Sequence, residues 1–200
     1  MGILCLLSLM TPDVIVLRGG SGTGKSSLLR SLRPGFPRGS AIDSDNIRDL
    51  LNLHDWMDPS PYRLCLSAVA AIARCHVAGG VEPVLIADTF AWPVLAGFLA
   101  DLEGMRDVVV FSLYARPDTT VQRMTARDGD YLVGAALRNS LAQGAEQRIT
   151  GPTMFAIDTD CLDEAEVLEV VMRSLSQGAL APSEGKADHT LRSIEIHVQG

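Results

Sequence analysis

Short aliphatic runs alternate along the chain with longer segments in which apolar residues recur at helical spacing. A run that is apolar at every position predicts a strand buried on both faces, because an alternating strand would leave one face polar. The predicted strands lie at residues 14–17, 39–43, 83–88, 107–115 and 154–158. The predicted helices lie at residues 25–32, 46–53, 62–78, 92–102, 117–127, 131–144 and 163–176.

This alternation of strand and helix favours an α/β fold with a mostly parallel five-stranded sheet and helices on both faces. We expect one domain over residues 13–177, preceded by an extension at 1–12 and followed by a flexible tail at 178–200. Residues 193–198 alternate in polarity, so an added edge strand and a disordered tail both remain open there.

Composition narrows the class of protein. The chain of 200 residues is 47% hydrophobic and 20% charged, which is enough to bury a substantial core. Its net charge of −7 argues against a dedicated nucleic-acid-binding protein, because phosphate contacts need a clustered basic face. The apolar N-terminus lacks a basic region and is too short to span a bilayer, and no C-x-x-C pair occurs. We therefore expect a cytoplasmic protein with reduced thiols, without a membrane anchor or a metal site made of Cys and His.

The most specific motif is GGSGTGKS, residues 19–26, which follows the first predicted strand and leads into the first predicted helix. Phosphate-binding loops of this pattern are called P-loops. The motif fits G-x-x-x-x-G-K-[ST] with Gly19, Gly24, Lys25 and Ser26 at the fixed positions. Lys25 and Lys186 are the chain's two lysines, which makes a lysine here notable. Glycines let backbone amides curl around a phosphate, the helix dipole adds positive potential, and the Ser26 hydroxyl can ligate Mg²⁺. The predicted nucleotide-binding residues are Gly19, Gly20, Ser21, Gly22, Thr23, Gly24, Lys25, Ser26 and Ser27.

A second motif, VLIAD, is an aliphatic strand that ends in Asp88. A carboxylate there can hold Mg²⁺ directly or through water, so we predict a metal site made by Ser26 and Asp88. An ordinary strand followed by a helix-capping Asp is the alternative.

The segment AIDSDNIRDLL lies at the carboxyl end of the second predicted strand, on the sheet edge that carries the P-loop. A carboxylate beside an arginine suits transfer of a phosphoryl group to a hydroxyl, because the Asp accepts the proton and the Arg balances charge. We predict Asp45 as the base with Arg48 as its partner. Asp43 is a second candidate, and any of Asp43, Ser44 and Asp45 can instead cap the next helix.

Arg123 and Arg127 are four residues apart on one predicted helical face, just before a glycine-containing break. Arginines at a lid, which we place at about residues 127–148, can neutralise the phosphoryl group during transfer, although a solvated helix face is the alternative. His54, Trp56 and Tyr62 either line an acceptor pocket or pack under a loop. Thr159 or Asp160 is expected to cap the helix that follows.

Residues 13–175 resemble the small P-loop kinases that phosphorylate hydroxyl groups. The resemblance rests on four motifs together, namely the P-loop, DSDNIR, VLIADT and RMTAR. This group includes polynucleotide kinases and the chloramphenicol phosphotransferase type of kinase. The resemblance implies a three-layer P-loop NTPase fold, ATP and Mg²⁺ as cofactors, Asp45 as general base, Arg48 and Asp88 near the acceptor, and Arg123 and Arg127 in the lid. We expect a small-molecule hydroxyl acceptor, because the chain is acidic. A polynucleotide 5′-hydroxyl kinase and a regulatory P-loop NTPase remain alternatives, although no N-K-x-D guanine motif occurs.

Overall fold

The protein is described by a computed structural model that covers residues 11–51, 59–129, 134 and 153–178. Five strands form one sheet, and every neighbouring pair in it is parallel. The order across the sheet is β2-β3-β1-β4-β5. The strands are β1 (Val14–Gly19), β2 (Ser40–Asp43), β3 (Val84–Asp88), β4 (Val108–Tyr114) and β5 (Met154–Asp158).

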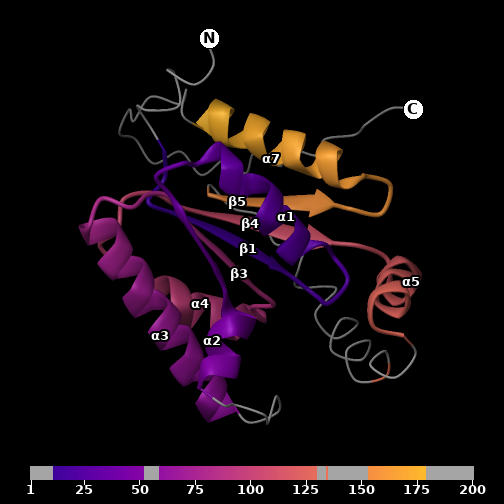
Figure 1. Ribbon diagram of the computed structural model, residues 1–200, viewed down its shortest axis with the longest axis horizontal. Coiled ribbons are helices and arrows are strands. Elements are labelled where there is room, and N and C mark those ends of the chain that lie inside the picture. The colour runs from indigo at the N-terminus through magenta and orange to yellow at the C-terminus, as the bar shows by residue number, and fades with distance from the viewer. Residues whose placement is uncertain (1–10, 52–58, 130–133, 135–152, 179–200) are drawn as a thin grey trace.

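Helices cover both faces of this sheet, so the predicted three-layer α/β fold is confirmed (Figure 1). One layer contains α1 and α7, and the other contains α3 and α4. The helices are α1 (Lys25–Leu32), α2 (Ser44–Leu50), α3 (Pro59–Ala78), α4 (Trp92–Asp101), α5 (Pro117–Asp128) and α7 (Glu164–Gly178), with a short 3₁₀ turn, η2 (Arg33–Gly35), after α1.

The central strand β1 shows why its sequence is aliphatic at every position. Val14 and Val16 pack into the core under α3 and α4, whereas Ile15 and Leu17 pack into the core under α1 and α7. All four side chains are fully buried. Burial at about 25 cal/mol per Å² of apolar surface makes such a two-sided strand a main source of the stability of the sheet.

Two local predictions need correction. The helix predicted at 46–53 begins at Ser44 and ends at Leu50, because Asp43 caps it by accepting a hydrogen bond from the Asp45 amide. The prediction that Thr159 or Asp160 caps the last helix is wrong. The side chains of Asp163 and Glu166 each accept a hydrogen bond from the other residue's backbone amide, which forms a capping box, so α7 begins at Glu164.

Other predictions lie outside the described residues. These are the helix at 131–144, most of the lid at 127–148, the strand or tail at 193–198, and the side chains of His54 and Trp56. Within the described part of the chain, no helix is both long and apolar enough to cross a membrane.

Candidate active site

The P-loop joins β1 to α1 at the carboxyl edge of the sheet, and its glycines are required by close approach and by backbone conformation. A Cβ on Gly19 would lie 2.4 Å from the carbonyl oxygen of Leu113, which no side chain tolerates. Gly24 has φ +96° and is the N-cap of α1, and nothing lies within 4 Å of where its Cβ would be. The loop is therefore tight on its sheet side and open at the start of the helix.

The polar groups of this loop fit a bound phosphate chain. The amides of Gly22 and Gly24 donate no hydrogen bond to any residue that the structure describes. The Nζ atom of Lys25 donates to the carbonyl of Gly20 at 2.9 Å, which holds the ammonium group beside the loop. Free amides, a helix N-terminus and a nearby cation are the groups that bind the phosphates of a nucleotide.

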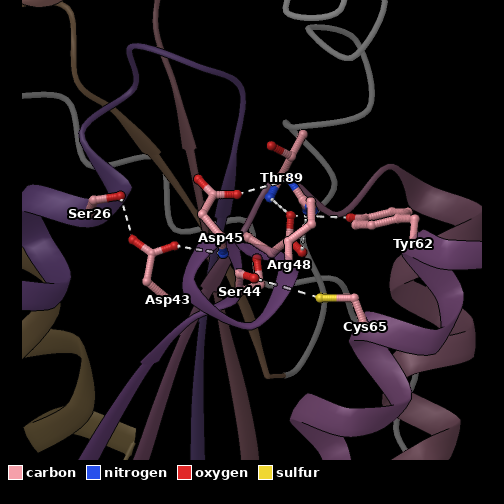
Figure 2. A network of polar contacts seen from close by, with 9 residues as sticks. Ser26, Asp43, Ser44, Asp45, Arg48, Tyr62, Cys65 and Thr89 are labelled. Carbon is pink, nitrogen blue, oxygen red and sulfur yellow. Dashed lines mark hydrogen bonds and ion pairs between the residues drawn. The ribbon is translucent and has the colours of Figure 1, made fainter. Parts of the chain in front are cut away.

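Ser26, the first residue after the P-loop lysine, is bound by Asp43 of β2. Its hydroxyl donates to Asp43 Oδ2 at 2.8 Å, while Asp43 Oδ1 accepts the Asp45 amide at 3.2 Å (Figure 2). A hydroxyl and a carboxylate oxygen are ligands that Mg²⁺ accepts, and that ion keeps several waters and substrate oxygens, so two protein groups suffice. The pair therefore fits the metal that accompanies a nucleoside triphosphate.

Asp88, predicted to hold the metal with Ser26, has other partners. Its Oδ1 accepts hydrogen bonds from the hydroxyl of Tyr62 at 3.2 Å and from the Thr89 amide. Its Oδ2 forms an ion pair with Arg48 at 3.5 Å, and its side chain is only 2% exposed. A metal role for Asp88 stays a prediction, and the contacts favour Asp43 instead.

Arg48 forms ion pairs with both Asp45 and Asp88. Its Nη1 donates to Asp45 Oδ1 at 2.9 Å, and its guanidinium lies 5.1 Å from the centre of the Tyr62 ring. The arginine side chain is 9% exposed, whereas that of Asp45 is 62% exposed. Asp45 is thus held by Arg48, which is itself paired with Asp88, while the Asp45 side chain is largely exposed to solvent.

Burial and neighbouring charges shift the pKa values of Lys25 and Asp45. Burial lowers the pKa of Lys25, while Asp88, Asp45 and Asp43 act in the opposite direction. Partial burial raises the pKa of Asp45, opposed by Arg48 and Lys25, and solvent around the carboxylate limits the rise. Ser26 binds Asp43, and Asp43 accepts the Asp45 amide, so the P-loop and Asp45 lie at the same edge of the sheet.

Tyr62 and Cys65 line the same site from α3. Burial raises the pKa of Tyr62 far above its ordinary value, and the neighbouring Asp88 adds to the rise, so the phenol keeps its proton and donates it to Asp88. Burial likewise raises the pKa of the Cys65 thiol, which donates a weak hydrogen bond to the carbonyl of Ser44 at 3.6 Å (Figure 2). Of the three residues predicted near an acceptor pocket, Tyr62 is thereby placed at the site.

The two arginines predicted in the lid, Arg123 and Arg127, both lie on α5 but have different surroundings. Arg123 of α5 donates to the carbonyl of Thr159 at 2.5 Å, to the Thr159 hydroxyl at 3.1 Å and to the carbonyl of Gly22 at 3.5 Å. Arg127, one turn further along α5, is exposed and lowers the pKa of Lys25, so its charge is felt at the P-loop. Contact of either arginine with a phosphate stays a prediction.

The sequence patterns did not predict Arg18 near this site, and they predicted a different role for Thr159. Arg18 is 1% exposed and lies in register with Asp88 on β3 and Ser112 on β4, at the end of β1. An arginine at the end of an otherwise aliphatic run was the available signal. Thr159, expected to cap a helix, instead contacts the P-loop through its hydroxyl, 3.3 Å from the carbonyl of Thr23.

No protein-family model matches the chain, and no curated protein sequence is significantly similar to it. Solved structures do match. A gluconokinase from Sinorhizobium meliloti 1021 aligns with 84% of this chain and 94% of its own, at TM-score 0.63 and 20% identity. The chain has the fold of the small P-loop kinases.

Two further structures share this small P-loop kinase fold. A shikimate kinase from Acinetobacter baumannii aligns with 86% of this chain and 97% of its own, at TM-score 0.59 and 18% identity. The tunicamycin resistance protein of Deinococcus radiodurans aligns with 83% of this chain and 96% of its own, at TM-score 0.58 and 21% identity. At these identities the likeness concerns the fold, and any activity must be argued from the site.

Proposed function

We propose that the protein is a kinase that transfers the γ-phosphate of ATP to a hydroxyl group of a small molecule. The observation that supports the proposal is that the Asp43 carboxylate accepts both the P-loop Ser26 hydroxyl at 2.8 Å and the Asp45 amide at 3.2 Å, so that the exposed Asp45 side chain follows directly from a residue bound to the P-loop. A P-loop alone indicates nucleotide binding, whereas a solvent-facing carboxylate at the same edge of the sheet suits an acceptor whose hydroxyl must lose a proton. Two proteins of similar structure are a gluconokinase and a shikimate kinase, which supports a small-molecule acceptor.

In the proposed reaction the acceptor oxygen attacks the γ-phosphorus, and the bond from that phosphorus to the β,γ-bridging oxygen breaks. ADP leaves with the electron pair of that bond, and Asp45 accepts the proton of the acceptor hydroxyl. Arg48 holds the Asp45 carboxylate through the 2.9 Å hydrogen bond and keeps it ionised. A positioned base of this kind contributes roughly 10²–10⁴-fold to rate.

The phosphate side of the site stabilises the charge that spreads over the transferred group. The P-loop amides and Lys25 bind the phosphates, and Arg127 adds positive charge from α5. Mg²⁺, when bound, would neutralise charge on the phosphate oxygens, and Ser26 and Asp43 are the residues that would hold it. Charge stabilisation and positioning account for most of the catalysis in phosphoryl transfer.

The acceptor can be found by its effect on ATP turnover. We would screen nucleosides, sugars and hydroxylated antibiotics, together with an oligonucleotide that has a free 5′-hydroxyl, for acceptor-dependent release of ADP. The proposal expects at least one small hydroxylated compound to increase ADP release and to gain a phosphate by mass spectrometry. Phosphorylation of the oligonucleotide alone, or ATP hydrolysis that no acceptor changes, would contradict it.

A further inference from the structure

The outer side of the P-loop is held by two residues that lie far from it in the sequence. The carbonyl of Gly22 accepts from Arg123 at 3.5 Å, and the carbonyl of Thr23 lies 3.3 Å from the Thr159 hydroxyl. A loop that turns its amides toward an anion turns carbonyls away from it, and those carbonyls need donors elsewhere. Arg123 on α5 and Thr159 after β5 supply those donors.

Thr159 is the centre of this arrangement. It is 2% exposed, and its hydroxyl also lies 3.1 Å from the carbonyl of Tyr114 and 3.1 Å from Arg123 Nη1. Since a hydroxyl has one proton, it accepts from the guanidinium and donates to one of the two carbonyls, Thr23 or Tyr114. The Thr159 amide donates to the Tyr114 carbonyl at 2.9 Å, so the backbone is fixed as well.

Packing brings α5 against the same part of the loop. Gly22 has φ +80°, and a Cβ there would lie 2.8 Å from a backbone oxygen of α5 and 3.2 Å from Met124 Cγ. Because no gap separates the two segments, a change in the hydrogen bonds that join them must alter the shape of the loop.

We propose that Thr159 is a positioning residue for the nucleotide. Together with Arg123 it forms a clamp that holds the carbonyls of Gly22 and Thr23 outward and thereby keeps the P-loop amides directed toward the phosphates. Arg123 then acts through the loop, whereas the sequence alone predicted that it acts on the phosphoryl group. The clamp consists of hydrogen bonds within the fold and does not depend on the proposed function. Its effect on the affinity for ATP rests on the proposed function.

Hydrogen exchange without nucleotide tests the clamp independently of activity. Thr159→Val keeps the shape of the side chain and removes the hydroxyl, and Thr159→Ser keeps the hydroxyl. Ser174→Ala is the control, because the Ser174 hydroxyl is partly buried but donates to the Val170 carbonyl within α7. We expect a peptide that covers residues 19–26 to exchange roughly three- to tenfold faster in Thr159→Val only. Unchanged exchange, or equal acceleration in the control, would overturn the clamp.

Calorimetry of ATP binding tests whether the clamp increases the affinity of the P-loop for the nucleotide. Thr159→Val should weaken ATP binding roughly three- to tenfold, and Thr159→Ser should restore it. Adding Arg123→Lys should weaken binding by less than the product of the two separate effects, because both changes break one clamp. Unchanged affinity in Thr159→Val would overturn the positioning role. Failure of the wild-type protein to bind ATP would instead overturn the proposed function, while the exchange result still judges the clamp.

Discussion

Asp43 and Asp45 are two residues apart, yet the structure gives them different partners. Asp43 binds the Ser26 hydroxyl and caps α2, whereas Asp45 faces solvent and binds Arg48. The alternation of side chains at the end of a strand and the turn into a helix produce this division. One carboxylate is therefore suited to a metal and the other to a proton.

This division predicts the metal dependence of single variants. Asp43→Asn should raise the Mg²⁺ concentration needed for half-maximal activity by roughly 10- to 100-fold, because the amide holds the ion less well. Asp49→Asn, on the exposed side of α2, is the matched control and should leave it unchanged. A Mg²⁺ titration of activity measures both. A large shift in Asp88→Asn with none in Asp43→Asn would return the metal role to Asp88.

The charge around Asp45 predicts the pH profile of the reaction. A base works when ionised, so activity should fall on the acid side as Asp45 gains its proton, at a pH above that of an ordinary aspartate. Arg48 lowers the pKa of Asp45, so Arg48→Gln should move this acid limb to higher pH. The measurement is kcat/KM against pH in both proteins. An acid limb that stays in place would show that Arg48 does not act on the base.

Some of these residue roles were accessible from the sequence and others were not. The P-loop residues are contiguous, so their spacing alone predicts them, and the pairing of Asp45 with Arg48 follows from their separation of one helical turn. The bonds from Ser26 to Asp43 and from Tyr62 to Asp88 join residues of different elements. Such pairings depend on how strands are ordered in space, which local spacing does not encode.

At the scale of elements, the start of α7 is set by a pair of reciprocal hydrogen bonds. Asp163 and Glu166 satisfy each other's amides at 2.7 and 2.9 Å. The sequence pattern D-x-x-E carries this signal, but Thr159 and Asp160 competed with it as capping residues. The competing residues are instead held by α5 and by the loop before it, through Arg123 and Arg116.

The capping box predicts a measurable loss of stability. Asp163→Ala should lower the free energy of unfolding by about 1 kcal/mol, because the Glu166 amide at the helix start loses its side-chain acceptor. Glu169→Ala removes only an exposed pair with Arg173 and should cost about 0.3 kcal/mol. Denaturant unfolding of both variants gives the comparison. Equal losses would show that the box does not stabilise α7.

At the scale of the whole molecule, the buried strands made the fold predictable. Runs such as those of β1 and β3 are aliphatic because each strand packs against helices on both faces. The order β2-β3-β1-β4-β5 was not predicted, since it depends on where each crossover returns to the sheet. That order places β1 between β3 and β4, with the P-loop, Asp43 and Asp88 all at one edge, where ligands of such sheets bind.

The proposed division of this edge into a phosphate side and an acceptor side is best tested with Asp45→Asn and the acceptor that the screen identifies. ATP affinity by calorimetry and phosphate transfer to that acceptor are measured on the same preparations. We predict ATP affinity within about twofold of the wild-type protein and transfer slower by roughly 10²–10⁴-fold. Transfer at the wild-type rate, with ATP bound normally, would contradict the account.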